Sequence, residues 1–244
     1  IYRNLIAGGM APSTPAAAIR WVSLPEQETV TGTLASLPAR AAALGTPALV
    51  VVGKVVRMRR SLAWFERRPL FGRRIAVTRA REQASILETR LTGLGAAVFL
   101  APAIRIVPPA DPRPLNREAR ALALGRYPWL VVSSPNVVRH LFEALVRAGA
   151  DARALAGVRV VAIGPATAEA LEARGVRADL LPVRNTSAGI VSLLSPWRAG
   201  LSGQLLLLPR SSRAPSGLPE ALRGLGARVV TVEAYRTVAE PLLP

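Results

Sequence analysis

Short apolar runs alternate with longer amphipathic stretches along most of this chain. The short runs, such as Leu205–Leu208, are typical of strands that are buried on both faces, and the amphipathic stretches indicate helices. The predicted strands are Ile75–Thr78, Ala97–Leu100, Trp129–Ser133, Val158–Ile163, Asp179–Leu181, Leu205–Leu208 and Arg228–Val232. The predicted helices are Glu82–Gly93, Pro135–Ala148, Pro165–Arg174, Thr186–Leu194 and Pro215–Leu225. This alternation predicts an α/β protein with parallel sheets.

The first part of the chain has its own pattern. We expect buried strands at Ala16–Trp21 and Ala48–Val52, the second continuing through Val55-Val56. Between them, an alanine-rich helix is predicted over Leu34–Leu44, with Gly45 at its end. Arginine and proline then mark two breaks, at Arg57–Arg74 and at Pro108–Pro114. We interpret the first break as a solvated linker and the second as a loop or crossover.

An internal repeat organises the rest of the chain. Residues 75–107 match residues 206–238 at a constant offset of 131 without a gap, so that Arg79 corresponds to Arg210. Gly93-Leu94-Gly95-Ala96 likewise corresponds to Gly224-Leu225-Gly226-Ala227. Each copy has a strand, an arginine-bearing turn, a helix, a second strand and an extended segment. A gapless register of this length indicates two related α/β lobes.

The extended segments that close the two copies are Ala103–Val107 and Glu233–Val238. If they pair with each other, they form a two-stranded ladder between the lobes. Residues 109–230 are then one complete five-strand lobe, and residues 74–108 are the first part of the other lobe. The rest of that lobe is expected beyond Pro244.

Composition narrows the chemistry. Cysteine is absent and His140 is the single histidine, which excludes disulfides, thiolate metal sites and histidine relays; we expect no metal. The 32 basic residues, of which only Lys54 is a lysine, face 15 acidic ones, a formal net charge of +17. Such a field attracts polyanions. The arginines are scattered along the chain, which argues against nucleic acid. With no apolar run of membrane length and no signal peptide, we expect no membrane partner and a cytoplasmic location.

Candidate binding residues lie in the turns after the predicted strands. Such turns start helices, whose free backbone amides suit carboxylates or phosphates. Ser134 and Thr186 also fit ordinary helix caps, with Pro135 and Pro165 at the first helical position. Tyr235 lies in a predicted ladder strand. From the sequence alone, its side chain could pack in the core or face the cleft between the lobes.

Five ordered motifs give a family resemblance. They are Ile75-Ala76-Val77-Thr78-Arg79-Ala80, Val132-Ser133-Ser134-Pro135-Asn136-Val137-Val138, Ala162-Ile163-Gly164-Pro165-Ala166-Thr167-Ala168, Leu208-Pro209-Arg210 and Ala234-Tyr235-Arg236-Thr237-Val238. From about Arg74 onward the chain resembles uroporphyrinogen-III synthases.

Residues 1 to about 65 resemble the C-terminal end of uroporphyrinogen-III C-methyltransferases. The matching stretches are Ser13-Thr14-Pro15-Ala16-Ala17-Ala18-Ile19, Gln27, Val30-Thr31-Gly32-Thr33-Leu34 and Pro47–Val56. The two resemblances together imply a fragment of a bifunctional methyltransferase–synthase fusion. The expected segments are a methyltransferase fragment over 1–62, a linker over 63–73, part of synthase lobe 1 over 74–108, lobe 2 over 109–230 and a return ladder strand over 231–244.

The resemblance implies a fold of flavodoxin-like lobes that bind the substrate between them. It also implies the cyclisation of hydroxymethylbilane to uroporphyrinogen III, with loss of water and inversion of ring D, and no cofactor or metal. Tyr235 is expected to assist departure of the hydroxyl. The expected substrate-binding residues are Arg79, Ser133, Ser134, Asn136, Gly164, Thr167 and Arg210. In the methyltransferase part, Pro15, Ala17 and Val22 are expected to contact S-adenosylmethionine, and that part is a candidate for dimerisation.

Two alternatives stay open at this point. The parent protein could act mainly as an S-adenosylmethionine-dependent methyltransferase in siroheme, cobalamin or heme biosynthesis. The chain could instead be a non-catalytic module that binds anions or nucleic acid. We also expect the 244 residues alone to be poorly active, because half of the predicted cleft is missing.

Overall fold

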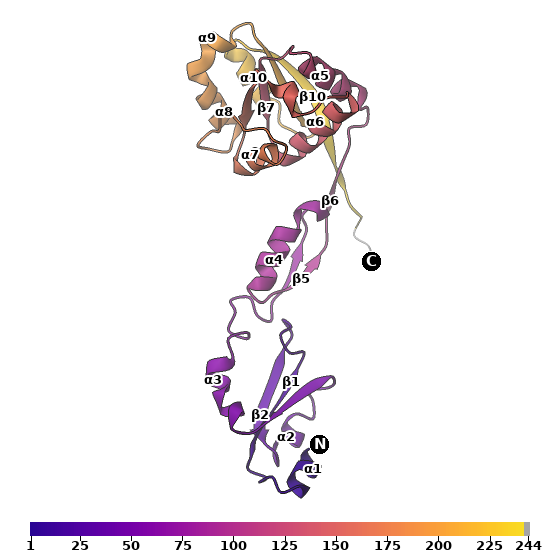
Figure 1. Cartoon of the computed structure of the whole chain (residues 1–244), viewed down its shortest axis with the longest axis vertical. Helices are drawn as coiled ribbons and strands as arrows, with labels where there is room; N and C mark the ends of the chain where they lie inside the picture. Colours follow the sequence, from indigo (N-terminus) through magenta and orange to yellow (C-terminus); the bar gives the residue numbers. More distant parts are fainter. Residues whose placement is uncertain (242–244) are drawn as a thin grey trace. The chain divides into compact units, whose positions relative to one another are not determined.

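The computed structural model describes residues 1–241, apart from the side chain of Glu82. The chain divides into two compact units, Ile104–Ala239 and the residues that flank it, Ile1–Ala103 with Glu240 onward (Figure 1). The segment boundaries expected from the sequence stay predictions, and residues 242–244 of the last segment lie outside the described part.

The first unit begins with a three-stranded antiparallel sheet in the order β2-β1-β3. Its elements are α1 (Tyr2–Ala7), β1 (Pro15–Arg20), β2 (Glu28–Thr33), α2 (Leu37–Arg40) and β3 (Ala48–Val52). Both predicted strands form, and β1 is buried at Ala16, Ala17 and Ala18. The predicted burial of the second strand is wrong, because Ala48 and Leu49 of β3 are exposed and its other residues are half-buried. The long helix predicted over Leu34–Leu44 is wrong, because only α2 is helical. Residues with strong strand propensity, including Thr29, Val30 and Thr31, form β2 directly before it.

Beyond β3 the chain turns instead of continuing as a strand. Gly53 has φ +115°, and Lys54–Met58 form the 3-10 helix η1, followed by α3 (Arg59–Leu62). The predicted extension through Val55-Val56 is therefore wrong, because only glycine adopts this backbone conformation without strain.

The arginine-rich segment after α3 is fastened to the sheet by one carboxylate. Glu66 Oε1 accepts hydrogen bonds from Gln27 Nε2 at 2.9 Å and from Thr29 Oγ1 at 2.6 Å. The other oxygen of Glu66 accepts a hydrogen bond from the Arg59 guanidinium. The segment that we interpreted as a solvated linker is thus held against β2 by hydrogen bonds from Gln27 and Thr29 to Glu66, and the Arg59–Glu66 ion pair joins α3 to the same carboxylate.

The internal repeat is confirmed in three dimensions. Its first copy contains β4 (Arg74–Val77), η2 (Arg81–Gln83), α4 (Ser85–Gly93) and β5 (Ala97–Leu100), and its second contains β9 (Leu205–Ser211), α10 (Gly217–Gly224) and β10 (Arg228–Ala239). In both copies the strands are parallel, and both registers begin at equivalent pairs, Arg74 with Ala97 and Leu205 with Arg228. Gly95 and Gly226 end the two helices with φ +98° and +96°.

The second unit is built on a five-stranded sheet in the order β6-β10-β9-β7-β8. Its remaining elements are β6 (Ile104–Val107), α5 (Arg113–Ala123), β7 (Trp129–Val132), α6 (Pro135–Arg147), η3 (Ala152–Leu155), β8 (Arg159–Ala162), α7 (Pro165–Glu172), α8 (Ser187–Leu194), η4 (Ser195–Trp197) and α9 (Arg198–Leu201). The four strands from β10 to β8 are parallel. The predicted strand Asp179–Leu181 is reduced to one bridge, between Leu180 and Val161.

The predicted ladder is also confirmed. β6 pairs antiparallel with the end of β10, from Val107 opposite Arg236 to Ile104 opposite Ala239. The sequence predicted two successive segments, 228–232 and 233–238, where the structure has one strand. β10 runs through both and absorbs an irregularity between Glu233 and Tyr235, where the register shifts.

Helices cover both faces of this sheet, which explains why its central strands are apolar throughout. Leu130 and Val132 of β7 face the core beneath α5, α6 and α7, whereas Trp129 and Val131 face the core beneath α8, α9 and α10 (Figure 1). α5 was missed, because arginines interrupt its apolar positions and the Pro108–Pro114 stretch suggested a loop. The neighbours β7 and β9 send their chains to opposite faces, which makes their carboxyl ends a topological switch point.

Candidate functional site

The predicted site residues of the second unit gather at the carboxyl ends of β7, β8 and β9. Ligands of open parallel sheets bind at this edge, where strand order reverses. The turn after β7 carries Ser133 and Ser134, both half-buried, and Arg210 is one of the last two residues of β9. The tertiary fold therefore brings together residues that lie far apart in the sequence.

Ser134 has two partners. It is the N-cap of α6, and its Oγ accepts a hydrogen bond from Val137 N at 3.2 Å. Its Oγ also lies 3.4 Å from the hydroxyl of Tyr235. Asn136, in the first turn of the same helix, is half-buried. Ser134 thus caps α6 as the sequence allowed, and the hydroxyl of Tyr235 also lies at the start of this helix.

Tyr235 reaches this turn from the irregular part of β10. Its backbone carbonyl accepts a hydrogen bond from Ser212 N at 3.1 Å. Its half-buried ring packs against the larger core and stacks on His140, with ring centroids 6.0 Å apart and planes at 20°. This pairing of Tyr235 with His140 was not foreseen, because the two residues lie on separate elements.

His140 is held by charged groups on its own helix. Its Nδ1 lies 3.2 Å from a carboxylate oxygen of Glu143, and its Nε2 lies 3.2 Å from Nη2 of Arg139. Burial lowers the pKa of His140 below its usual value, and the positive charges of Arg139 and Arg147 lower it further, against an opposing effect of Glu143. The imidazole is therefore neutral at pH 7.

The turn after β8 is tightly packed. Gly164 caps α7, and a Cβ at this position would lie 3.0 Å from Cγ of Asn185, so a larger residue would require that side chain to shift by a few tenths of an ångström. Thr167 is only 2% exposed, which leaves little of its side chain for a ligand. Of these two predicted binding residues, Gly164 is suited to act through its backbone.

Arg210 is partly engaged in its own loop. Its Nη2 donates to the carbonyl oxygens of Ala214 and of Pro215, the latter at 2.6 Å. It lines an open cavity of about 320 Å³. The other lining residues are Ser211, Ser212, Ala214, Ser216, Thr231, Val232 and Glu233. Arg79, its equivalent in the first repeat, is exposed and donates from Nε to Gln83 Oε1 at 3.0 Å.

A model of the family described as uroporphyrinogen-III synthase HemD matches residues 85–244. The chain belongs to this family. It is 32% identical over 179 residues to the uroporphyrinogen-III synthase of Synechococcus elongatus, covering 72% of this chain and 65% of that protein. It is also 47% identical over 69 residues to the siroheme synthase of Chromobacterium violaceum, covering 28% of this chain and 15% of that protein.

A solved structure of this synthase family supports the fold. The mutant uroporphyrinogen III synthase of Thermus thermophilus matches with a TM-score of 0.52 and 23% identity, over 69% of this chain and 64% of that one. The chain spans only part of the first two curated relatives that it matches, covering 36% of the length of one and 65% of the length of the other.

The residues expected to contact S-adenosylmethionine lie in the first unit. Ala17 and Val22 line a largely apolar cavity of about 260 Å³ together with Ile19, Val51 and Val55. Pro15 lines a neighbouring cavity whose wall includes Arg40, Arg57 and Arg60. Both cavities include Val56, Arg59 and Ala63, so the two are adjacent.

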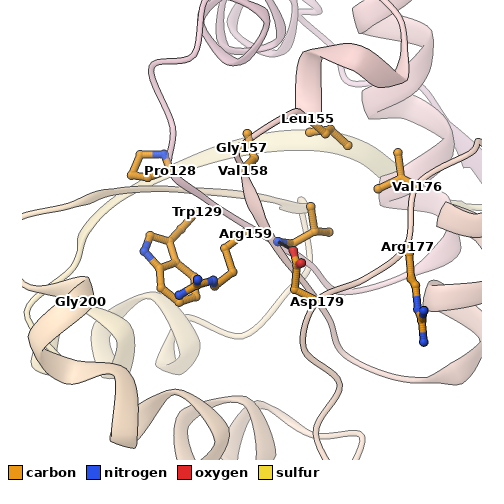
Figure 2. Close-up of a pocket in the computed structure, with 11 residues that line it drawn as sticks. Pro128, Trp129, Leu155, Gly157, Val158, Arg159, Val176, Arg177, Asp179 and Gly200 are labelled. Atoms are coloured by element: carbon orange, nitrogen blue, oxygen red, sulfur yellow. Dashed lines mark hydrogen bonds between the residues drawn. The ribbon is translucent and has the colours of Figure 1, made fainter.

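The cavity in Figure 2 lies at the opposite, amino-terminal edge of the second unit's sheet. The Arg159 guanidinium lies 5.1 Å from the ring centre of Trp129 and 4.3 Å from that of Trp197. Asp179 Oδ2 accepts a hydrogen bond from Val160 N at 2.6 Å. These stacked and hydrogen-bonded groups fasten strand starts, and no predicted site residue lies here.

Two further findings concern residues 1–241. None of their helices is long and apolar enough to cross a membrane. Within the same range, leaving aside the side chain of Glu82, no three acidic or histidine side chains come close enough to hold a metal ion.

Proposed function

We propose that this chain carries the uroporphyrinogen-III synthase activity. It closes the linear tetrapyrrole hydroxymethylbilane into uroporphyrinogen III, with loss of water and inversion of ring D. The observation that carries the proposal is the hydroxyl of Tyr235, 3.4 Å from Ser134 Oγ at the N-terminus of α6. A proton donor and an anion-binding helix start meet at the edge where a ligand of this fold is expected.

The substrate's charge matches the surroundings. Hydroxymethylbilane carries eight carboxylates, and the chain has a net charge of +17. In this proposal the side chains of Ser133, Ser134, Asn136 and Arg210 and the backbone at Gly164 hold carboxylates. Arg79 serves the other lobe, and Thr167, being buried, supports the turn after β8 rather than contacting the substrate.

The chemistry begins at the terminal hydroxyl of the substrate. Ser134 Oγ accepts a hydrogen bond from Val137 N, so its own proton is free to donate to the Tyr235 oxygen. The phenol proton of Tyr235 then points to the leaving hydroxyl, which departs as water when its C–O bond breaks. The resulting azafulvene cation is attacked by the terminal pyrrole to give a spiro intermediate. Rearrangement with loss of a ring proton restores the phenol and yields the macrocycle.

Correct positioning of the substrate accounts for much of the catalysis, because the azafulvene cation also closes to a macrocycle without an enzyme. Holding the flexible chain in one geometry is worth more here than a strong acid or base. The proposed cycle needs no cofactor, since water leaves, the proton returns and no electrons are transferred.

Product isomer analysis tests the proposal. Hydroxymethylbilane is incubated with the gene product that contains these residues, and the products are oxidised and separated as type I and type III isomers. Spontaneous closure gives type I, so we expect a protein-dependent excess of type III. Type I product at the uncatalysed rate would refute the proposal and would leave an anion-binding module as the better explanation.

We further propose that residues 1–62 are the C-terminal fragment of an S-adenosylmethionine-dependent tetrapyrrole methyltransferase, fused to the synthase. The partial similarity to a siroheme synthase supports this. The apolar cavity beside Ala17 and Val22 suits a flat adenine ring, which these two residues would hold, and Pro15 would contact the cofactor from the adjacent cavity. The bound cofactor would supply the methyl group. Equilibrium dialysis with S-adenosylmethionine and the full gene product tests this, and absence of saturable binding would refute it.

A further inference from the structure

His140 is the single histidine of the chain, and its surroundings are too specific for a residue that only fills space. It is 4% exposed and lies in the middle of α6. Two charged side chains contact its two ring nitrogens, and an aromatic ring covers one face. Each contact constrains a different property of the imidazole.

The two nitrogen contacts select one protonation state. A guanidinium only donates hydrogen bonds, so Arg139 Nη2, 3.2 Å away, requires a lone pair on His140 Nε2. The ring proton then lies on Nδ1 and points to Glu143 Oε2 at 3.2 Å. A second proton on Nε2 would lose the bond from Arg139 and place two positive charges together. The neutral ring with Nδ1–H is the form that this geometry holds.

The face contact joins His140 to Tyr235. Ring centroids 6.0 Å apart with planes at 20° form an offset stack within the range that aromatic pairs prefer. Ser134, at the start of the same helix, lies 3.4 Å from the phenol oxygen. A single rigid helix therefore contacts Tyr235 at its ring and at its hydroxyl.

We propose that His140 is a positioning residue for Tyr235. Held as the neutral Nδ1–H form by Arg139 and Glu143, its ring fixes the plane of the tyrosine and keeps the hydroxyl beside Ser134 at the carboxyl edge of the sheet. The catalytic consequence rests on the synthase function proposed above, whereas the contact itself does not. Because a displacement of about 1 Å costs on the order of 100-fold in rate, a loosened tyrosine lowers turnover without weakening substrate binding.

Two substitutions separate positioning from packing. His140→Phe keeps an aromatic ring of similar size and loses both nitrogen contacts, whereas His140→Ala loses the ring as well. Phe142→Ala is the matched control, because Phe142 lies on the same helix, is 4% exposed and belongs to the same core. Among the described residues the Phe142 ring does not stack on Tyr235, so this change removes an aromatic ring from α6 and keeps the stack of His140 on Tyr235.

For His140→Phe we expect kcat to fall by about 10- to 100-fold, with KM within about threefold and a smaller fraction of type III product. The kcat of His140→Ala is expected to fall at least as far. Phe142→Ala is expected to be less stable and to keep the wild-type isomer ratio. A kcat for His140→Phe within about twofold of wild type overturns the proposal. So does an equal loss in Phe142→Ala at equal folded fraction.

A second measurement does not depend on activity. Because the chain has one histidine, 15N-labelled protein gives a single imidazole signal set in a long-range 1H–15N spectrum. We expect the Nδ1–H tautomer at pH 7 and a ring-proton shift that changes in Tyr235→Leu. An Nε2–H tautomer, or ring protons unmoved by Tyr235→Leu, overturns the contact. If these signals are as expected while wild-type protein forms no type III product, the synthase function fails and the contact stands.

Discussion

Two tyrosines of the second unit offer the same chemical change with opposite expected results. Tyr235→Phe removes a hydroxyl at the carboxyl edge of the sheet, beside Ser134. Tyr127→Phe removes a hydroxyl from the interior, where Tyr127 is 1% exposed and donates to the carboxylate of Glu118. Both changes keep the aromatic ring, so differences between them report on the hydroxyl alone.

The structure gives the expected cost in stability. Within the part of the chain that the structure describes, the Tyr235 hydroxyl has one hydrogen-bond contact, at the long distance of 3.4 Å, and its loss should cost no more than about 0.5 kcal/mol. Glu118 is 5% exposed, and its other oxygen accepts a hydrogen bond from Arg117 Nε at 2.7 Å. Removing the Tyr127 donor leaves a buried carboxylate short of a partner, which should cost about 1.5 to 3 kcal/mol.

The expected effects on activity are reversed. A positioned proton donor contributes about 100- to 10,000-fold, so Tyr235→Phe should lower kcat by at least the smaller factor. Tyr127→Phe should keep kcat within about twofold, because the buried hydroxyl has no path to the substrate.

Urea unfolding and product isomer analysis, done on the same preparations, measure the two effects. Since the chain has two units, unfolding is followed through a signal from the second unit alone, such as hydrogen exchange of α6 and β7 amides. Wild-type kcat and type III fraction in Tyr235→Phe would refute the role of this hydroxyl. A stability loss in Tyr235→Phe as large as in Tyr127→Phe would show that it is a structural group.

Three further results are expected. Burial in the folded protein lowers the pKa of His140 below its usual 6.5, so the unfolded chain binds that proton more tightly. The free energy of unfolding should therefore decrease as pH falls from about 6.5 to the pKa of the folded state. A difference in unfolding free energy between wild type and His140→Phe that does not change across this pH window would contradict the prediction. Gly95→Ala should destabilise the first unit by at least about 1 to 2 kcal/mol in urea unfolding, because φ is +98° and a Cβ would lie 2.8 Å from Arg68 Cβ. An unchanged urea midpoint would show that the turn relaxes to accept the methyl group. Arg210→Gln should raise KM for hydroxymethylbilane about tenfold with little change in kcat, since it removes one charged contact with a substrate carboxylate, worth about 1.5 kcal/mol. An unchanged KM would show that Arg210 only holds its own loop.

Much of the fold could be predicted from local pattern. Strands such as Ala97–Leu100 and Ala48–Val52 have the predicted bounds, because continuous apolar runs between turn signals have few other interpretations. Their burial was not predicted correctly, since the residues of both strands are half-buried or exposed. The predictions failed where tertiary contacts outweigh local preference. The helix expected over Leu34–Leu44 is short, and α5 forms where arginines between its apolar positions hid the helical spacing.

The candidate site divides in the same way. The helix-start motif around Ser134 is a local signal, and capping of α6 by its side chain follows from the sequence alone. Its neighbour Tyr235 lies 101 residues further along the chain, and the contact exists only because β10 continues past its irregularity. The contact of His140 with Tyr235 had no sequence signal beyond the single histidine on an apolar helix face.

The sequence by itself determined the α/β class, the two copies of one repeat, the positive charge and the motifs of the synthase family, because each depends on residue types at short range or fixed offset. Only the tertiary structure decided which of these residues meet. Strand order sets which turns share an edge, and the register of β10 sets which side chain arrives there. These long-range pairings arise from the burial of both sheet faces at once, which no local segment encodes.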